Sequence, residues 1–127
     1  MVLKVGIIGC GGIANGKHLP ALSKLDTVAL VAFCDLEIER AEKAKVDYGT
    51  KDASTFTDYQ ELLKLDLDVV HVLTPNSSHA PLTIAALEAG NHVMCEKPMA
   101  KTSEEAKAMI DAANRTGKKL TIGYQNP

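Results

Sequence analysis

The chain has 127 residues, enough for one globular domain with a hydrophobic core of its own. Its formal net charge is −2, it has no Trp, and only 4% of its residues are aromatic. These values argue against the basic surface and stacking rings by which proteins bind nucleic acids. No apolar run approaches the ~20 residues that span a bilayer, and the N-terminus shows no signal peptide. The cysteines number three, which is odd, so we expect them to be reduced in a cytoplasmic protein. From the charge, the aromatic content and the apolar runs, we expect binding to neither nucleic acid nor membrane.

Short apolar runs recur along the chain and predict the strands of a sheet. The runs are continuous rather than alternating, so both faces of each strand should be covered by helices, as in a parallel sheet. Five runs and one shorter, weaker segment are expected as strands, at residues 3–8, 28–34, 54–56, 69–73, 93–95 and 120–122.

Helical patterns separate these runs and are expected at residues 37–47, 57–63, 80–89 and 102–116. Thr57 and Thr102 each stand three residues before Gln or Glu, which is the capping-box pattern. The last helix should bury one face, formed by Ala106, Met109, Ile110 and Ala113. The regular alternation predicts a doubly wound α/β fold of the Rossmann type, with six strands in the order 3-2-1-4-5-6.

A glycine turn, Gly9-Cys10-Gly11-Gly12-Ile13-Ala14, follows the first strand and fits G-x-G-x-x-A. Gly9 permits a tight turn, and Gly11 lets the backbone approach a pyrophosphate closely. The helix that follows would direct its N-terminal N–H groups at the phosphates. The turn therefore predicts a dinucleotide site, the alternative being a purely structural glycine turn.

Asp35 ends the second strand, roughly 20 residues beyond the glycine turn, where Rossmann domains place an acid. It could accept hydrogen bonds from both ribose hydroxyls of the adenosine, and it would repel a 2′-phosphate. No Arg or Lys stands next to it in sequence, since Arg40 is a helical turn further on. We therefore expect NAD rather than NADP. The alternative is that Asp35 only caps the next helix.

Two further segments follow strands that should flank the switch point, where ligands bind in open α/β sheets. Thr74-Pro75-Asn76 follows the fourth strand, and Glu96-Lys97-Pro98 follows the fifth. Lys97 would reach the nicotinamide, where it could protonate a substrate oxygen or accept a proton. The alternatives are a plain loop before the next helix and a solvated surface turn.

Together, GCGGIA, Asp35, TPNSSH and AALEAGNHVMCEKP resemble the N-terminal domain of the glucose–fructose oxidoreductase / inositol dehydrogenase / MocA (Gfo/Idh/MocA) family, over essentially the whole chain. The resemblance implies NAD(P)-dependent oxidation or reduction of a CH–OH/keto carbon of a sugar, polyol or related compound. It implies Lys97 as the catalytic lysine and Glu96 as the carboxylate of the same motif. The cofactor contacts it implies, with those expected from the turns, are Gly9, Gly11, Gly12, Ile13, Asp35, Thr74, Pro75, Asn76, His79, Glu96 and Lys97.

The family carries a second, mostly antiparallel domain that supplies most of the substrate site. This chain ends with Gly123-Tyr124-Gln125-Asn126-Pro127, which resembles the family's last strand and hinge. We expect residues 1–127 to be an isolated cofactor domain that binds NAD(H) with little turnover. Whether the chain forms a homo-oligomer stays open. Two other functions also stay open: a non-catalytic NAD(H)-sensing module, and a methyltransferase-like domain that binds an adenosyl group through the same turn.

The remaining residues with reactive side chains are interpreted as structural. Cys10, Cys34 and Cys95 fall at strand ends, where small packed residues are expected and a metal site or redox switch is the alternative. His71 lies inside the fourth strand and is expected to be a core residue. We therefore predict no metal site.

Overall fold

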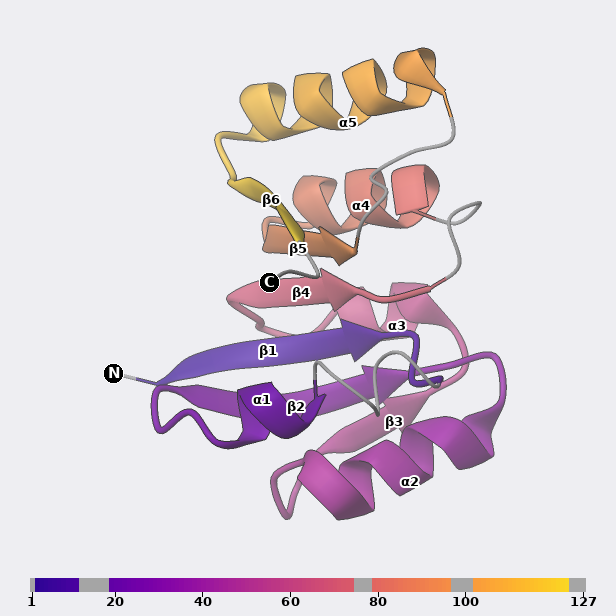
Figure 1. Cartoon of the computed structure of the whole chain (residues 1–127), viewed down its shortest axis with the longest axis vertical. Coiled ribbons are helices and arrows are strands. Elements are labelled where there is room, and N and C mark those ends of the chain that lie inside the picture. The colour runs from indigo at the N-terminus through magenta and orange to yellow at the C-terminus, as the bar shows by residue number, and fades with distance from the viewer. Residues whose placement is uncertain (1, 12–18, 75–78, 97–101, 124–127) are drawn as a thin grey trace.

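The computed structural model describes residues 2–11, 19–74, 79–96 and 102–123. These residues form a six-stranded parallel sheet in the order β3-β2-β1-β4-β5-β6, with helices on both faces, which confirms the predicted fold (Figure 1). The strands are β1 Leu3–Ile8, β2 Val28–Cys34, β3 Ser54–Phe56, β4 Val69–Val72, β5 His92–Glu96 and β6 Leu120–Gly123. The helices are α1 Leu19–Ser23, α2 Ile38–Tyr48, α3 Tyr59–Leu63, α4 His79–Glu88 and α5 Ser103–Thr116.

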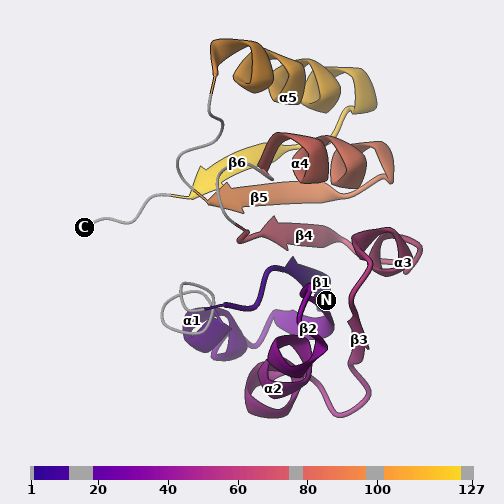
Figure 2. The same cartoon turned by 90° about the vertical axis from the view of Figure 1, so that its right-hand side faces the viewer.

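Two hydrophobic clusters lie on opposite faces of the sheet, because successive strand residues point to opposite sides. One cluster joins α1 and α2 to β1 and β2, and includes Val5, Ile7 and Phe33. The other joins α3, α4 and α5 to the sheet, and includes Val70 and Val72 of β4. Figure 2 shows the two groups of helices flanking the sheet. The continuous apolar runs are therefore explained by burial on both faces.

The two predicted capping boxes have different outcomes. Thr102 forms one with Glu105: its hydroxyl accepts from the Glu105 N–H at 3.1 Å, and the Glu105 carboxylate accepts from the Thr102 N–H at 3.3 Å. Thr57 does not cap α3. Asp58 is the N-cap, and its carboxylate accepts from the Gln60 N–H at 2.9 Å. The carboxylate one residue later takes the capping position, because Asp is at least as good an N-cap as Thr.

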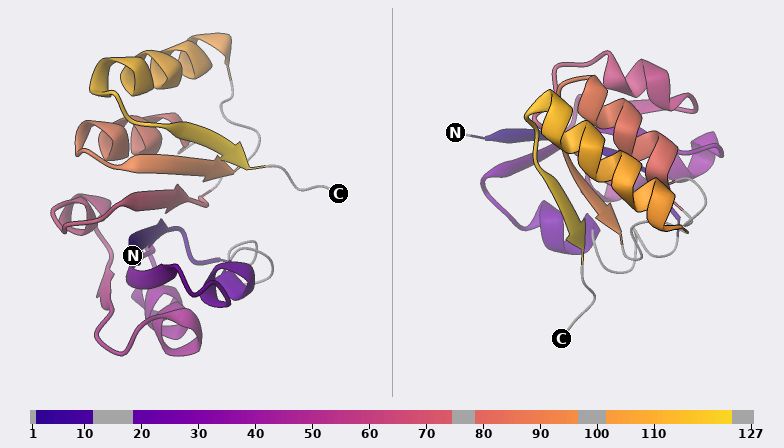
Figure 3. Two further views of the ribbon diagram at one scale, coloured as in Figure 1. Left: turned by 90° about the vertical axis from the view of Figure 1, so that its left-hand side faces the viewer. Right: turned by 90° about the horizontal axis from the view of Figure 1, so that it is seen from above.

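The buried face of α5 also differs from the prediction. Met109 and Ala112 are fully buried, whereas Ile110 is 48% exposed. The helix lies beside α4, as the right-hand view of Figure 3 shows, and contacts α4 more extensively than the sheet. A helix that packs mainly on one neighbour buries a narrower stripe than the sequence pattern indicates, so Ile110 is left outside it.

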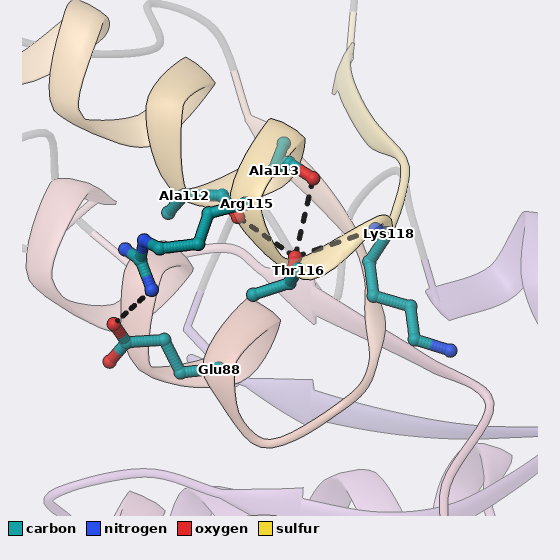
Figure 4. Close-up of polar contacts among 6 residues, drawn as sticks. All are labelled: Glu88, Ala112, Ala113, Arg115, Thr116 and Lys118. Carbon is teal, nitrogen blue, oxygen red and sulfur yellow. Dashed lines mark hydrogen bonds and ion pairs between the residues drawn. The ribbon is translucent and has the colours of Figure 1, made fainter.

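Polar contacts connect the end of α5 to α4 and to the segment before β6 (Figure 4). Arg115 Nη1 lies 3.0 Å from Glu88 Oε2 of α4. The Thr116 hydroxyl donates to the Ala112 carbonyl at 2.8 Å and accepts from the Lys118 N–H at 3.4 Å.

None of the helices in the described ranges has both the length and the apolar character that a membrane span needs.

One buried hydroxyl in α4 is expected to lower stability. Thr83 of α4 is 0% exposed, and its Oγ1 has no hydrogen-bond partner within the described part of the chain. Replacing it by the similarly shaped valine removes a desolvated polar atom, so Thr83→Val is expected to raise the free energy of unfolding by about 1 kcal/mol.

Urea unfolding of the variant and the parent would measure this change. Thr116→Val is the matched control, because its hydroxyl is hydrogen-bonded to the end of α5 and its loss should lower stability instead. A loss of stability in both variants would contradict the prediction for Thr83.

Candidate functional site

The candidate site lies where the carboxyl ends of four strands meet. All strand pairs are parallel, so the residues that follow β1, β2 and β4 and the last residue of β5 lie at one edge of the sheet. Ile8 pairs with Cys34 on one side and with Val72 on the other. The direction of strand order reverses between β1 and β4, which makes this edge the switch point at which open α/β sheets bind ligands.

The first glycine of the turn is required by the structure itself. Gly9 has a φ of +98°, a backbone conformation that favours glycine. A Cβ added there would lie 2.8 Å from the carbonyl carbon of Leu73 and 2.9 Å from the nitrogen of Thr74. The Gly9 N–H donates to the Cys34 carbonyl at 2.8 Å. The turn therefore packs directly against the end of β4, across the switch point.

Gly11 is different, because packing against the described residues does not explain its glycine. A Cβ built on it would lie 3.7 Å from Nη1 of Arg40, an ordinary van der Waals separation. The close approach that the sequence predicts for Gly11 is to a bound pyrophosphate. The contact also shows that Arg40 comes nearer to the turn than its distance in sequence from Asp35 indicated.

Asp35 is tied to the glycine turn by its side chain. Its Oδ2 accepts from the Cys10 N–H at 2.8 Å, and its Oδ1 accepts from the Glu37 N–H at 2.9 Å. Each carboxylate oxygen has about two acceptor sites, so each keeps capacity for one hydroxyl of a ribose. The N-cap of α2 is Glu37, which makes no side-chain cap hydrogen bond, and the Asp35 carboxylate accepts both from the Glu37 N–H at the start of that helix and from Cys10 of the turn.

The cysteines near this edge are buried. The Cys10 thiol donates to the Cys34 carbonyl at 3.5 Å. Burial and then the Asp35 charge raise the pKa of Cys10 to about 12, and the same two causes raise that of Cys34 to about 11. Both thiols stay protonated at neutral pH, whereas nucleophilic and metal-binding cysteines act as thiolates. This favours the packing interpretation, and no group of three candidate metal ligands occurs among the described residues.

The structure places the other expected site residues only in part. Thr74 directly follows Leu73 at the end of the β4 segment, His79 is the first residue of α4, and Glu96 is the last of β5. His71 is 6% exposed, inside the core as expected. The expected site residues that lie outside the described residues are Gly12, Ile13, Pro75, Asn76 and Lys97.

Sequence reasoning missed two contributors to this edge, the backbone N–H of Cys10 and the ion pair of Glu37 and Arg40. Only the i, i+3 spacing of opposite charges could have indicated the pair. No sequence pattern indicated the contact between Cys10 and Asp35, because it depends on how close the ends of β1 and β2 lie to one another.

A doubly wound sheet, a glycine turn packed across its switch point and a carboxylate tied to that turn define a dinucleotide-binding Rossmann domain. The family model described as "Oxidoreductase family, NAD-binding Rossmann fold" matches residues 3–124. The chain belongs to this family, Gfo/Idh/MocA, as the sequence resemblance implied.

Named relatives agree with this assignment. The chain is 42% identical to the D-glucoside 3-dehydrogenase of Escherichia coli K12, over 98% of the chain and 35% of the relative. It is 37% identical to the inositol 2-dehydrogenase of Salmonella typhimurium LT2, over 98% of the chain and 37% of that relative. The chain thus spans little more than a third of the length of these relatives.

Solved structures show the same fold. The WlbA dehydrogenase of Chromobacterium violaceum, in complex with NADH and UDP-GlcNAcA, superposes with a TM-score of 0.91 at 34% identity, over 98% of this chain and 36% of that one. The 3-ketoreductase KijD10 of Actinomadura kijaniata, in complex with NADP and TDP-benzene, gives a TM-score of 0.90 at 30% identity, over 97% of this chain and 37% of that one. One neighbour therefore binds NADH and the other NADP.

Proposed function

We propose that this chain is the cofactor-binding domain of an oxidoreductase that uses NAD to oxidise or reduce a CH–OH/keto carbon of a sugar, polyol or related compound. The observation that carries the proposal is the Asp35 carboxylate, tied to the glycine turn at the switch point. The names of the relatives, a glucoside dehydrogenase and an inositol dehydrogenase, support the substrate class.

The preference for NAD over NADP is part of the proposal. In the described part of the chain, the two groups that donate to the Asp35 carboxylate are both uncharged backbone N–H groups. The carboxylate therefore keeps its negative charge toward a bound ribose, where it would accept from the hydroxyls and repel a 2′-phosphate.

The proposed site extends the described edge with residues outside the described ranges. Gly9, Gly11, Gly12 and Ile13 would hold the pyrophosphate, and the segments at 74–79 and 96–97 would line the nicotinamide side. The bound nicotinamide would supply the hydride acceptor or donor. Lys97, directly after β5, would hold or release a proton at Nζ beside the reacting oxygen, with Glu96 at the end of the strand next to it.

Titration of the chain with NADH, followed by nicotinamide fluorescence, tests the proposed cofactor. S-adenosylmethionine in a parallel calorimetric titration tests the methyltransferase-like alternative. We expect saturable binding of NADH and none of S-adenosylmethionine. Binding of S-adenosylmethionine without NADH would overturn the proposal.

Lys97→Ala separates an oxidoreductase from a sensing module. In this chain, the variant should bind NADH within about threefold of the parent, because a proton-transfer group adds little to cofactor affinity. In a protein that joins this domain to a substrate domain, turnover should fall by about 10²–10⁴. Lys107→Ala, an exposed lysine on α5, is the control and should change neither. Absence of turnover in the joined parent protein would favour a sensor, and unchanged turnover in Lys97→Ala would contradict the catalytic role of Lys97.

The 127 residues alone are proposed to bind NAD(H) with little turnover, since they span about a third of the length of the relatives. A cytoplasmic location is proposed as well. All three cysteines are buried, and no disulfide joins them in the described part of the chain, which supports a reducing compartment. Homo-oligomerisation remains open in this proposal.

A further inference from the structure

The first turn of α2 places an ion pair beside Asp35. Arg40 Nε lies 2.7 Å from Glu37 Oε2, and the two side chains are 57% and 60% exposed. The Arg40 N–H also donates to the Glu37 carbonyl at 3.0 Å. The pair is therefore held within one helical turn, three residues apart.

This pair belongs to the same group of contacts as the candidate site. The Glu37 N–H donates to Asp35, and Asp35 accepts from Cys10 in the glycine turn. Arg40 completes the group, because its Nη1 would lie 3.7 Å from a Cβ on Gly11. The guanidinium thus lies close to Gly11 of the glycine turn.

The charges of this group bear on the 2′ position of that ribose. Asp35 and Glu37 are acids, and Arg40 is a cation whose Nη1 would lie 3.7 Å from a Cβ on Gly11. A guanidinium is the side chain best suited to bind a phosphate. Glu37 occupies its Nε, but an exposed ion pair of this kind is weak and a dianionic phosphate could compete for the guanidinium.

We propose that Glu37 is a positioning residue that keeps the Arg40 guanidinium engaged in an ion pair and so less available to a 2′-phosphate, which helps to set the discrimination between NAD and NADP. The inference rests on the proposed function and deepens it. Asp35 acts on the ribose directly, whereas Glu37 acts through Arg40. Neutralising Glu37 releases the guanidinium toward a 2′-phosphate and leaves the ribose contacts of NAD in place.

The test measures the dissociation constants of NADH and NADPH for the parent, Glu37→Gln, Arg40→Ala and the double variant. Glu37→Gln should tighten NADPH by about tenfold, the effect of one charge-assisted hydrogen bond, and change NADH by less than about twofold. In the Arg40→Ala background, the same substitution should change NADPH by less than about threefold. High salt should reduce the gain, because it screens exposed charges.

Two controls isolate the role of the pair. Glu37→Asp keeps an acid three residues before Arg40 and should show the same ratio of NADPH to NADH dissociation constants as the parent. Asp47→Asn removes the acid of the Lys43–Asp47 pair, 2.6 Å long, in the last turn of the same helix, and should affect neither dinucleotide.

An unchanged NADPH/NADH ratio in Glu37→Gln, with NADH binding intact, would overturn the inference alone. A gain that persists in full without Arg40 would also overturn it. If the parent chain binds neither dinucleotide, the proposed function fails and the inference fails with it.

Discussion

Replacing Gly9 by alanine is expected to lower the free energy of unfolding by about 2–5 kcal/mol and to weaken NADH binding by at least tenfold. Two costs add. An alanine at positive φ costs about 1–2 kcal/mol, and the new Cβ would lie 2.8 Å from the backbone of Leu73, where overpacking costs about 1–3 kcal/mol. Relieving that contact moves the glycine turn away from β4, so the N–H groups that should face the pyrophosphate are displaced.

Gly90 provides a matched control for this prediction. It has a φ of +95°, but a Cβ added there meets none of the described residues within 4 Å, and it lies between α4 and β5 at the opposite edge of the sheet. Gly90→Ala should therefore cost only the conformational part, about 1–2 kcal/mol, and leave NADH affinity unchanged. Urea unfolding and NADH titration of both variants measure the difference. Equal losses of stability and affinity in the two would contradict the packing argument.

Replacing Asp35 by alanine is expected to weaken NADH binding by about 100-fold, with little loss of NADPH binding. The variant loses the acceptor for the ribose hydroxyls, and hydrogen bonds to a charged group contribute about 1.5–3 kcal/mol each. For NADPH, the loss is offset because the charge that repels its 2′-phosphate disappears. Competitive titrations with both dinucleotides measure the change in ratio.

The loss of the Cys10 and Glu37 contacts could itself disturb the turn, so a variant with a similar structural cost is needed. Asp68 accepts from the Lys4 N–H at 2.8 Å at the opposite end of β1. Asp68→Ala removes a comparable carboxylate-to-backbone bond and should lower stability without changing the NADPH/NADH ratio. Unchanged NADH affinity in Asp35→Ala would contradict the ribose role.

The sequence predicted the fold because its signals are local and mutually consistent. Apolar runs such as 28–34 indicate strands buried on both faces, and the capping box at Thr102 marks the start of α5 where the structure has it. The sequence-based predictions were wrong where a local pattern is compatible with more than one structure. Both Thr57 and Asp58 can cap a helix, and the stripe through Ile110 describes an amphipathic face without saying which neighbour covers it.

For the candidate site, the sequence alone determined the kind of binding domain. The glycine turn, the acid at the end of the second strand and the motif after the fifth are short patterns whose spacing has a chemical reason. The tertiary structure decided which groups meet at the sheet edge. Gly9 against Leu73, Cys10 bonded to Asp35, and Arg40 over Gly11 all join segments brought together only by the pairing of β1 with β2 and β4. Such contacts depend on strand register and helix position, for which single residues carry no local signal.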